Sequence, residues 1–191
     1  MELLLASTSR YRRELLARLG VPFRCRAPEC DEQQYKSLGL PLRDLAARLA
    51  LEKARSLAEL ESTATIIGSD QICACGELRL SKPGSAEAAV EQLEQLQGRE
   101  HQLLTALCVW HGGRAIAHLD VTTLVMRRLA RDELERYVAA DDPIDCAGSY
   151  KLEQRGVTLF ERIESADHSA ITGLPLIALT TILRELGYAV P

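Results

Sequence analysis

Short apolar runs alternate with amphipathic helical segments along the whole chain. The runs at 2–6 and 65–68 are rich in leucine and isoleucine and too short for helices, which is typical of buried strands. The segments at 10–19 and 41–60 carry leucines at the helical period instead. Since strands alternate with helices, and a long hairpin around the Gly112-Gly113 pair interrupts that order, we expect an α/β fold with a mixed sheet.

Capping and turn residues indicate the other elements. Gly98 and Gly187 follow helical segments and are good helix ends, and Ser85 is a good N-cap. Further strands are expected at 21–26, 72–80 (a hairpin), 100–111, 115–127 and 157–164, further helices at 85–97, 132–139 and 175–187, and a loop at 27–40. No repeat or Pro/Gly/Ser-rich linker divides the chain, so residues 1–191 are expected to form a single domain, of one lobe or two.

Composition and charge exclude several classes of protein. The 47% of hydrophobic residues and 26% of charged residues are ordinary for a globular domain. A formal net charge of -4 argues against a protein that coats nucleic acid. No apolar run approaches the ~20 residues of a membrane helix, and the stretch from Met1 to Ala6 lacks the pattern of a signal peptide. We therefore expect a soluble cytoplasmic protein, without nucleic-acid or membrane partners, whose cysteines are reduced thiols.

The segment from Ala6 to Arg13 leads a strand into a hydroxyl-rich turn, and the turn opens a helix. Free N–H groups and the positive helix end make such a place suitable for a phosphate. The helix dipole disfavours cations there, so the cluster of Arg10, Arg12 and Arg13 would be explained by a bound anion. The alternative interpretation is a capped surface helix with solvated arginines.

A second candidate is Asp70, at the expected end of the strand that begins at Thr65. Ligands of α/β sheets collect outside strand ends, and a carboxylate there can take a proton from water or hold Mg²⁺. The alternative is an aspartate that caps a turn. Lys53, on the 41–60 helix, and Lys82, before a proline, could each hold a phosphate, although a solvated lysine is the better interpretation of either one alone.

The last candidate is the segment 145–153, which combines small residues with Lys151 and Glu153. Ser149 is not in a G-x-S-x-G elbow and Cys146 has no histidine near it in sequence, so neither is expected to be a nucleophile. The cysteines and histidines lack the spacing of zinc ligands. Several cations, a carboxylate and a glycine-rich segment together favour polyphosphate chemistry with a metal.

These residues fall into motifs that, in order and over essentially the whole chain, resemble the Maf family of nucleotide pyrophosphatases. The motifs are A-S-x-S with two arginines (Ala6, Ser7, Ser9, Arg12, Arg13), D-E (Asp31, Glu32), E-K-A (Glu52, Lys53, Ala54), S-D (Ser69, Asp70), K-P (Lys82, Pro83) and A-G-S/A-aromatic (Ala147 to Tyr150). One departure is Ser81, where the family pattern has glycine. The resemblance implies a two-lobed Maf/ITPase-like fold, with an elongated mixed sheet, flanking helices and a central cleft.

The resemblance also implies an activity: a nucleoside triphosphate is cleaved between its α and β phosphorus atoms, giving the monophosphate and pyrophosphate. A divalent cation, Mg²⁺ or Mn²⁺, is needed, because metal and cations must neutralise the phosphates while a base takes the water proton. Asp70 would be the base and, with Glu32, a metal ligand. The phosphate ligands would be Ser7, Arg12, Arg13, Lys53 and Lys82. A homodimer is compatible with the family.

Base specificity in the family is set at the positions of Tyr11, Gln71 and Glu153, and these residues resemble the branch that acts on 7-methyl-GTP, where tryptophan is expected in place of Tyr11. Methylation makes guanine cationic, and an aromatic face attracts a cation by about 0.5–2 kcal/mol. The Glu153 carboxylate can accept the N–H groups of guanine but repels the carbonyl oxygens of uracil and thymine. The alternatives are a dTTP/UTP pyrophosphatase of the same family and a non-catalytic nucleotide-binding regulator of cell division. No P-loop motif supports a P-loop phosphoryl transferase.

Overall fold

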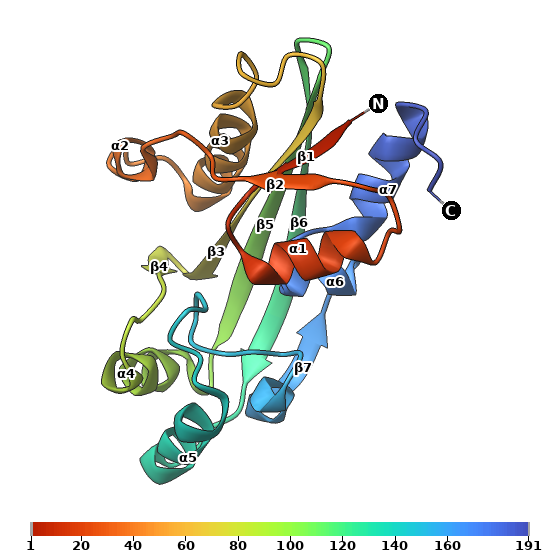
Figure 1. Cartoon of the computed structure of the whole chain (residues 1–191). Coiled ribbons are helices and arrows are strands. Elements are labelled where there is room, and N and C mark those ends of the chain that lie inside the picture. The colour runs from red at the N-terminus through yellow and green to blue at the C-terminus, as the bar shows by residue number, and fades with distance from the viewer. Residues whose placement is uncertain (1, 191) are drawn as a thin grey trace. The chain divides into compact units, whose positions relative to one another are not determined.

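The computed structural model describes residues 2–190, so Met1 and Pro191, which end the expected 1–191 domain, lie outside the described residues. A seven-stranded sheet has the order β2-β1-β3-β5-β6-β7, with β4 paired to β3 (Figure 1). β1 runs parallel to β2 and β3, whereas the β3–β4 and β6–β7 pairs are antiparallel. The expected mixed-sheet α/β fold is confirmed.

The elements have the following bounds. The strands are β1 (Leu3–Ala6), β2 (Arg24–Arg26), β3 (Thr65–Cys75), β4 (Leu78–Leu80), β5 (Glu100–His111), β6 (Arg114–Met126) and β7 (Phe160–Glu164). The helices are α1 (Arg10–Ala17), α2 (Glu32–Lys36), α3 (Leu42–Arg55), α4 (Ala86–Leu96), α5 (Arg131–Asp141), α6 (His168–Ile171) and α7 (Leu176–Glu185), with a 3-10 turn, η1 (Arg155–Leu159). Within residues 2–190, no helix is long and apolar enough to cross a membrane.

The chain divides into two compact units, which are described separately below. Unit 1 comprises Met1–Gln71, Thr105–Asp120 and Asp167–Pro191, and unit 2 comprises Ile72–Leu104 and Val121–Ala166. The strands β3, β5 and β6 contribute residues to both units. The expectation that residues 1–191 form a single domain stays a prediction.

The core of unit 1 joins the two ends of the chain, because α1 and α7 contribute to the same apolar cluster (Figure 1). Leu15 and Leu16 of α1 and Leu179 and Leu183 of α7 are buried with residues of β1, β3 and β5. The α1 helix begins after Ser9, whose hydroxyl accepts from the backbone N–H of the third helical residue. Burial of this face fixes the start of α1 at the edge of the candidate phosphate site.

A close contact at Gly68 brings α3 directly against β3. A Cβ atom at Gly68 would lie 2.2 Å from the carbonyl oxygen of Ala50 and 2.7 Å from the amide nitrogen of Ala54. Only glycine therefore allows the helix backbone to approach the strand so closely. This approach places Lys53, next to Ala54, opposite the part of β3 that carries Asp70.

In unit 2, α4 and α5 pack against each other (Figure 1). Ser85 caps α4 as expected, accepting from the N–H of Ala88 at 3.2 Å. A buried polar and aromatic cluster holds the segment that contains Tyr150: the Tyr150 hydroxyl lies 3.1 Å from Nε2 of His101, and its ring meets Phe160 edge-on at 4.9 Å. Burial lowers the pKa of His101 to about 4.

Two predicted boundaries around the candidate site were wrong. The strand predicted to begin at Thr65 does not end at Asp70, because β3 continues to Cys75. Its polar residues stay inside the sheet because their side chains find partners, described below. The predicted loop at 27–40 contains α2, which is capped by Asp31 through the N–H of Gln33 at 2.9 Å.

Other predicted elements differ mainly in length. The helix predicted at 41–60 ends at Arg55, where the Ser56 hydroxyl donates to the Lys53 carbonyl and turns follow. The strand predicted at 157–164 begins at Phe160, after η1. The strand predicted at 21–26 is confined to β2, and α6 was not predicted. The hairpin of β5 and β6 is confirmed.

Candidate active site

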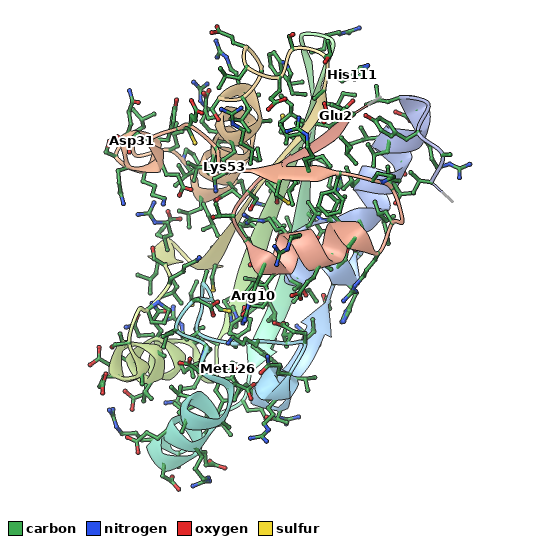
Figure 2. All side chains as sticks on the ribbon, in the orientation of Figure 1. Glu2, Arg10, Asp31, Lys53, His111 and Met126 are labelled. Atoms are coloured by element: carbon green, nitrogen blue, oxygen red, sulfur yellow. The ribbon has the colours of Figure 1, made fainter. Side chains whose placement is uncertain are left out.

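Lys53 of α3, labelled in Figure 2, lies between two carboxylates in unit 1. Its Nζ donates to Oδ1 of Asp70 at 2.6 Å and lies 2.9 Å from Oε1 of Glu32. Lys53 and Asp70 are both buried, with 6% and 8% of their surface exposed. The structure thus brings together three of the predicted site residues, from α2, α3 and β3, around one ammonium group.

Glu32 is held in its charged form. Burial opposes its ionisation, but hydrogen bonds and charge from Lys36 and Lys53 outweigh that effect and lower its pKa to about 2. Lys36 Nζ lies 2.6 Å from Oε2 of Glu32, one helical turn away on α2. Both oxygens of this carboxylate therefore face cations at neutral pH.

The two carboxylates fit a divalent cation. Their oxygens converge on a positively charged group, Lys53, which marks the position between them as one where a cation is stabilised. Across residues 2–190, no group of three or more His, Cys, Asp or Glu side chains is placed to hold a metal. Because Mg²⁺ is commonly bound through one or two carboxylates plus water and substrate phosphate, Glu32 and Asp70 are the residues here that could hold such an ion.

Arg12 reaches the same cluster from α1. Its Nε donates to the carbonyl of Gly173 at 2.9 Å, and the hydroxyl of Ser69 donates to the same oxygen at 2.9 Å. Burial lowers the pKa of Arg12, against the charges of Asp70 and Glu32, which raise it. For its two Nη atoms, no hydrogen bond or ion pair is recorded within the described chain. They are available for a phosphate, in the paired geometry that suits guanidinium.

The remaining phosphate candidates of unit 1 differ from Arg12. Ser7 is buried, and its hydroxyl accepts from the N–H of Ser9 at 3.1 Å, at the entry to α1. Arg13 is exposed, and among residues 2–190 no hydrogen bond or ion pair joins it to Lys53, Asp70 or Glu32. Its charge instead lies near the thiol of Cys25, where it lowers a pKa that burial raises.

Two of the three predicted specificity residues also lie in unit 1. The guanidinium of Arg10 lies over the ring of Tyr11, 4.7 Å from the ring centre, and donates to its hydroxyl at 2.8 Å. The side chain of Gln71 is turned toward the protein, since its Nε2 donates to Thr105 Oγ1 at 2.9 Å and to the carbonyls of Ala170 and Ile171 at 3.0 Å.

Lys82 and Glu153 belong to unit 2, and both are exposed. Neither side chain forms a hydrogen bond or an ion pair in the described part of the chain.

Lys151, by contrast, is buried, and its Nζ donates to the backbone carbonyls of Asp141 and Asp142 at 2.9 and 2.7 Å. Lys151 therefore provides hydrogen bonds to the last carbonyls of α5.

Sequence reasoning missed Thr105 and Gly173 as residues of this site. The sequence signal for Gly173 is the glycine itself, which stands just before the helix that starts after Pro175. The structure explains it, because Gly173 adopts a φ of +112° that side chains rarely tolerate. Thr105 gives no such signal. It is a buried threonine in a long strand, and only its hydrogen-bond partners reveal that it belongs to the site.

Comparison with known proteins gives consistent matches over the full chain. The family described as Maf-like protein matches residues 2–186. A protein of Bdellovibrio bacteriovorus named 7-methyl-GTP pyrophosphatase is 46% identical over 184 residues, covering 96% of both chains. Proteins of the same name from Pseudomonas putida and Xanthomonas campestris are 44% and 45% identical, covering at least 98% of each chain.

One solved structure is also similar. The nucleoside-triphosphatase, or dITP/XTP pyrophosphatase, of Mycobacterium abscessus covers 100% of both chains at 15% identity, with a TM-score of 0.47. A match at this level bears on neither substrate nor mechanism.

Proposed function

The chain belongs to the Maf family, and on that premise we propose that it hydrolyses a nucleoside triphosphate, preferably 7-methyl-GTP, to the monophosphate and pyrophosphate. One observation carries this proposal: a buried carboxylate, Asp70, lies among the cations that a triphosphate requires, with Lys53 at 2.6 Å. Relatives named 7-methyl-GTP pyrophosphatase, at 44–46% identity, support the choice of substrate.

Asp70 acts as the general base in this proposal. A triphosphate repels an incoming water, so its charge must be neutralised before attack on the α-phosphorus. Lys53 and Arg12 supply fixed positive charge, and the carboxylate of Asp70 takes the proton of the attacking water. Asp70 lies in the continuous strand β3 rather than at a flexible end, so its position is fixed before the substrate arrives.

Glu32 and Asp70 would together hold a divalent cation, Mg²⁺ or Mn²⁺. When bound, this ion would neutralise phosphate charge and help to orient the substrate. The remaining phosphate contacts are assigned to Ser7 and the Nη atoms of Arg12, with Arg13 and Lys82, both exposed, as further ligands. Their exposure supports a role in contacting substrate from solvent. A cytoplasmic location is also proposed, on the sequence patterns given above.

The choice of base rests on Tyr11, Gln71 and Glu153. Arg10, a planar delocalised cation, already lies over the Tyr11 ring, which supports that ring as a surface for cationic 7-methylguanine. The three acceptors around Nε2 of Gln71 leave its carbonyl oxygen to face a ligand, and that oxygen can accept from the N–H groups of guanine. Glu153 is assigned by its family position alone.

A pyrophosphate-release assay over 7-methyl-GTP, GTP, UTP and dTTP tests the proposal. We expect the highest kcat/KM for 7-methyl-GTP, a lower value for GTP, which lacks the ring charge, and the lowest values for the pyrimidine nucleotides. A preference for dTTP or UTP would overturn the substrate assignment but keep the reaction. Tight nucleotide binding without release of pyrophosphate would instead favour a non-catalytic regulator.

A further inference from the structure

One backbone oxygen, the carbonyl of Gly173, is shared by two residues of the candidate site. It accepts from Nε of Arg12 and from the hydroxyl of Ser69, each at 2.9 Å. Ser69 precedes Asp70 in β3. The same oxygen therefore orients the guanidinium and anchors the strand beside the proposed base. A Cβ at Gly173 would lie at an ordinary contact distance of 3.6 Å from Arg12 Nε, but the φ of +112° would strain the backbone of any residue with a side chain.

The turn that presents this carbonyl is tied at its two ends. Asp167 accepts from the N–H of Ser169 at 2.9 Å and from the N–H of Ile177 at 2.7 Å. The hydroxyl of Ser169 accepts from the N–H of Leu176 at 2.8 Å. These bonds join the start of α6 to the start of α7, so the intervening residues have little freedom.

The middle of the turn is held from β5 and β3. Thr105 Oγ1 donates to the Ala170 carbonyl at 3.0 Å and accepts from Nε2 of Gln71 at 2.9 Å. Gln71 Nε2 also reaches the carbonyls of Ala170 and Ile171. Because these two partners are carbonyl acceptors, the amide nitrogen must face them, and the orientation of Gln71 is fixed by chemistry. Thr105 is 1% exposed, so water does not replace its hydroxyl.

We propose that Thr105 is a positioning residue for Arg12. Through Gln71 and the 170–173 turn, it holds the Gly173 carbonyl that directs the Arg12 guanidinium toward phosphate. Loss of the Thr105 hydroxyl leaves the charge of Arg12 intact, but the guanidinium is no longer held in one orientation. Paired guanidinium–phosphate hydrogen bonds depend on that orientation. The inference rests on the proposed function in one respect, since it takes Arg12 as a phosphate ligand.

The test measures binding of inorganic pyrophosphate by calorimetry, without nucleotide or divalent cation. Thr105→Val should weaken binding by about tenfold, the size expected for one misdirected charged hydrogen bond. Thr105→Ser keeps the hydroxyl and should restore binding. The matched control is Thr65→Val: Thr65 is also buried in unit 1, and its hydroxyl bonds to Nδ1 of His111 at 2.8 Å, away from the turn. It should bind as the wild type does.

A double-mutant cycle with Arg12→Ala separates positioning from a general structural effect. If Thr105 acts through Arg12, Thr105→Val should cause no further loss in the Arg12→Ala background. Thr105→Cys, whose thiol is a weaker hydrogen-bonding group, should give an intermediate loss and takes the place of the valine variant if that variant does not fold.

Three results would overturn the inference: unchanged binding in Thr105→Val, an equal loss with and without Arg12, or no pyrophosphate binding by the wild type. Failure of the proposed function gives a different result. If the wild type hydrolyses no nucleotide while the coupling between Thr105 and Arg12 is observed, the reaction is wrong and the positioning role stands.

Discussion

Two lysines are buried to the same degree but in different surroundings. Lys53 of unit 1 is 6% exposed and Lys151 of unit 2 is 5% exposed. Lys53 faces two carboxylates, Asp70 and Glu32, whereas Lys151 donates to two backbone carbonyls at the end of α5 and has Asp145 only at 3.6 Å. Carboxylates can exchange a lysine for a metal or a proton, and backbone carbonyls cannot take a proton. A buried charged side chain thus indicates a catalytic site only when its partners can bind a proton or a metal ion in its place.

The largest difference between the two lysine sites should appear in kcat when the carboxylate beside each lysine is removed. Asp70→Asn should keep the fold but lower kcat by ~10²–10⁴-fold, the usual cost of losing a general base. Asp145→Asn, the matched change beside Lys151, should leave kcat near the wild-type value. Steady-state assays at saturating Mg²⁺ compare them. Near-normal turnover in Asp70→Asn would refute its assignment as the base.

Replacing the lysines themselves should separate the two sites by their response to metal. Lys151→Met leaves two carbonyls without a donor and should lower the free energy of unfolding by about 1–3 kcal/mol, with no rescue by Mg²⁺. Lys53→Met leaves two carboxylates facing each other, so added Mg²⁺ should raise its Tm more than it raises that of the wild type. Thermal unfolding with and without Mg²⁺ measures both. Equal responses would mean that Glu32 and Asp70 do not form a cation site.

A smaller, tenfold effect is expected at Tyr11, where a cation lies on an aromatic face outside the core. Tyr11→Ala should reduce the preference for 7-methyl-GTP over GTP by roughly tenfold, if the cation–π energy is near 1.4 kcal/mol. Arg10→Met should raise that preference slightly, because Arg10 competes for the ring. The ratio of the two kcat/KM values gives the answer, and a Tyr11→Ala enzyme that discriminates as well as the wild type would remove the ring from base recognition.

The smallest effect concerns the pH dependence of stability. The folded-state pKa of Glu32 is lowered from 4.5 to about 2, so its contribution is complete above pH 4.5 and is lost as the pH falls toward 2. The side chain is 35% exposed, so the contribution should be well below the ~3 kcal/mol that an unscreened shift of this size implies. Glu32→Gln should flatten the unfolding free energy across this range. If the unfolding free energy of the variant depends on pH as that of the wild type does, the pairing of Glu32 with Lys53 and Lys36 would be contradicted.

The sequence was sufficient for the fold class and for the main charges of the site. Ser85 and Gly98 indicated α4, the Gly112-Gly113 pair indicated the β5–β6 hairpin, and the family resemblance implied the roles of Glu32, Lys53 and Asp70. These signals depend on neighbouring residues or on residue type, and both kinds of signal can be read directly from the sequence.

The sequence was not sufficient where polar residues are satisfied from far away. Ser69 and Gln71 looked like a strand end, but their partners Gly173 and Thr105, 104 and 34 residues away in sequence, allow β3 to continue. The five-residue helix α2 is too short for a hydrophobic period. Positions such as these are fixed by tertiary hydrogen bonds, which leave no trace in local composition.

The most direct test of the central claim is hydrolysis of 7-methyl-GTP in ¹⁸O water, with mass analysis of both products. If water attacks the α-phosphorus beside Asp70, the label should appear in the monophosphate, with unlabelled pyrophosphate as the other product. Label in inorganic phosphate, with the diphosphate as co-product, would mean attack on the γ-phosphorus and would contradict the account.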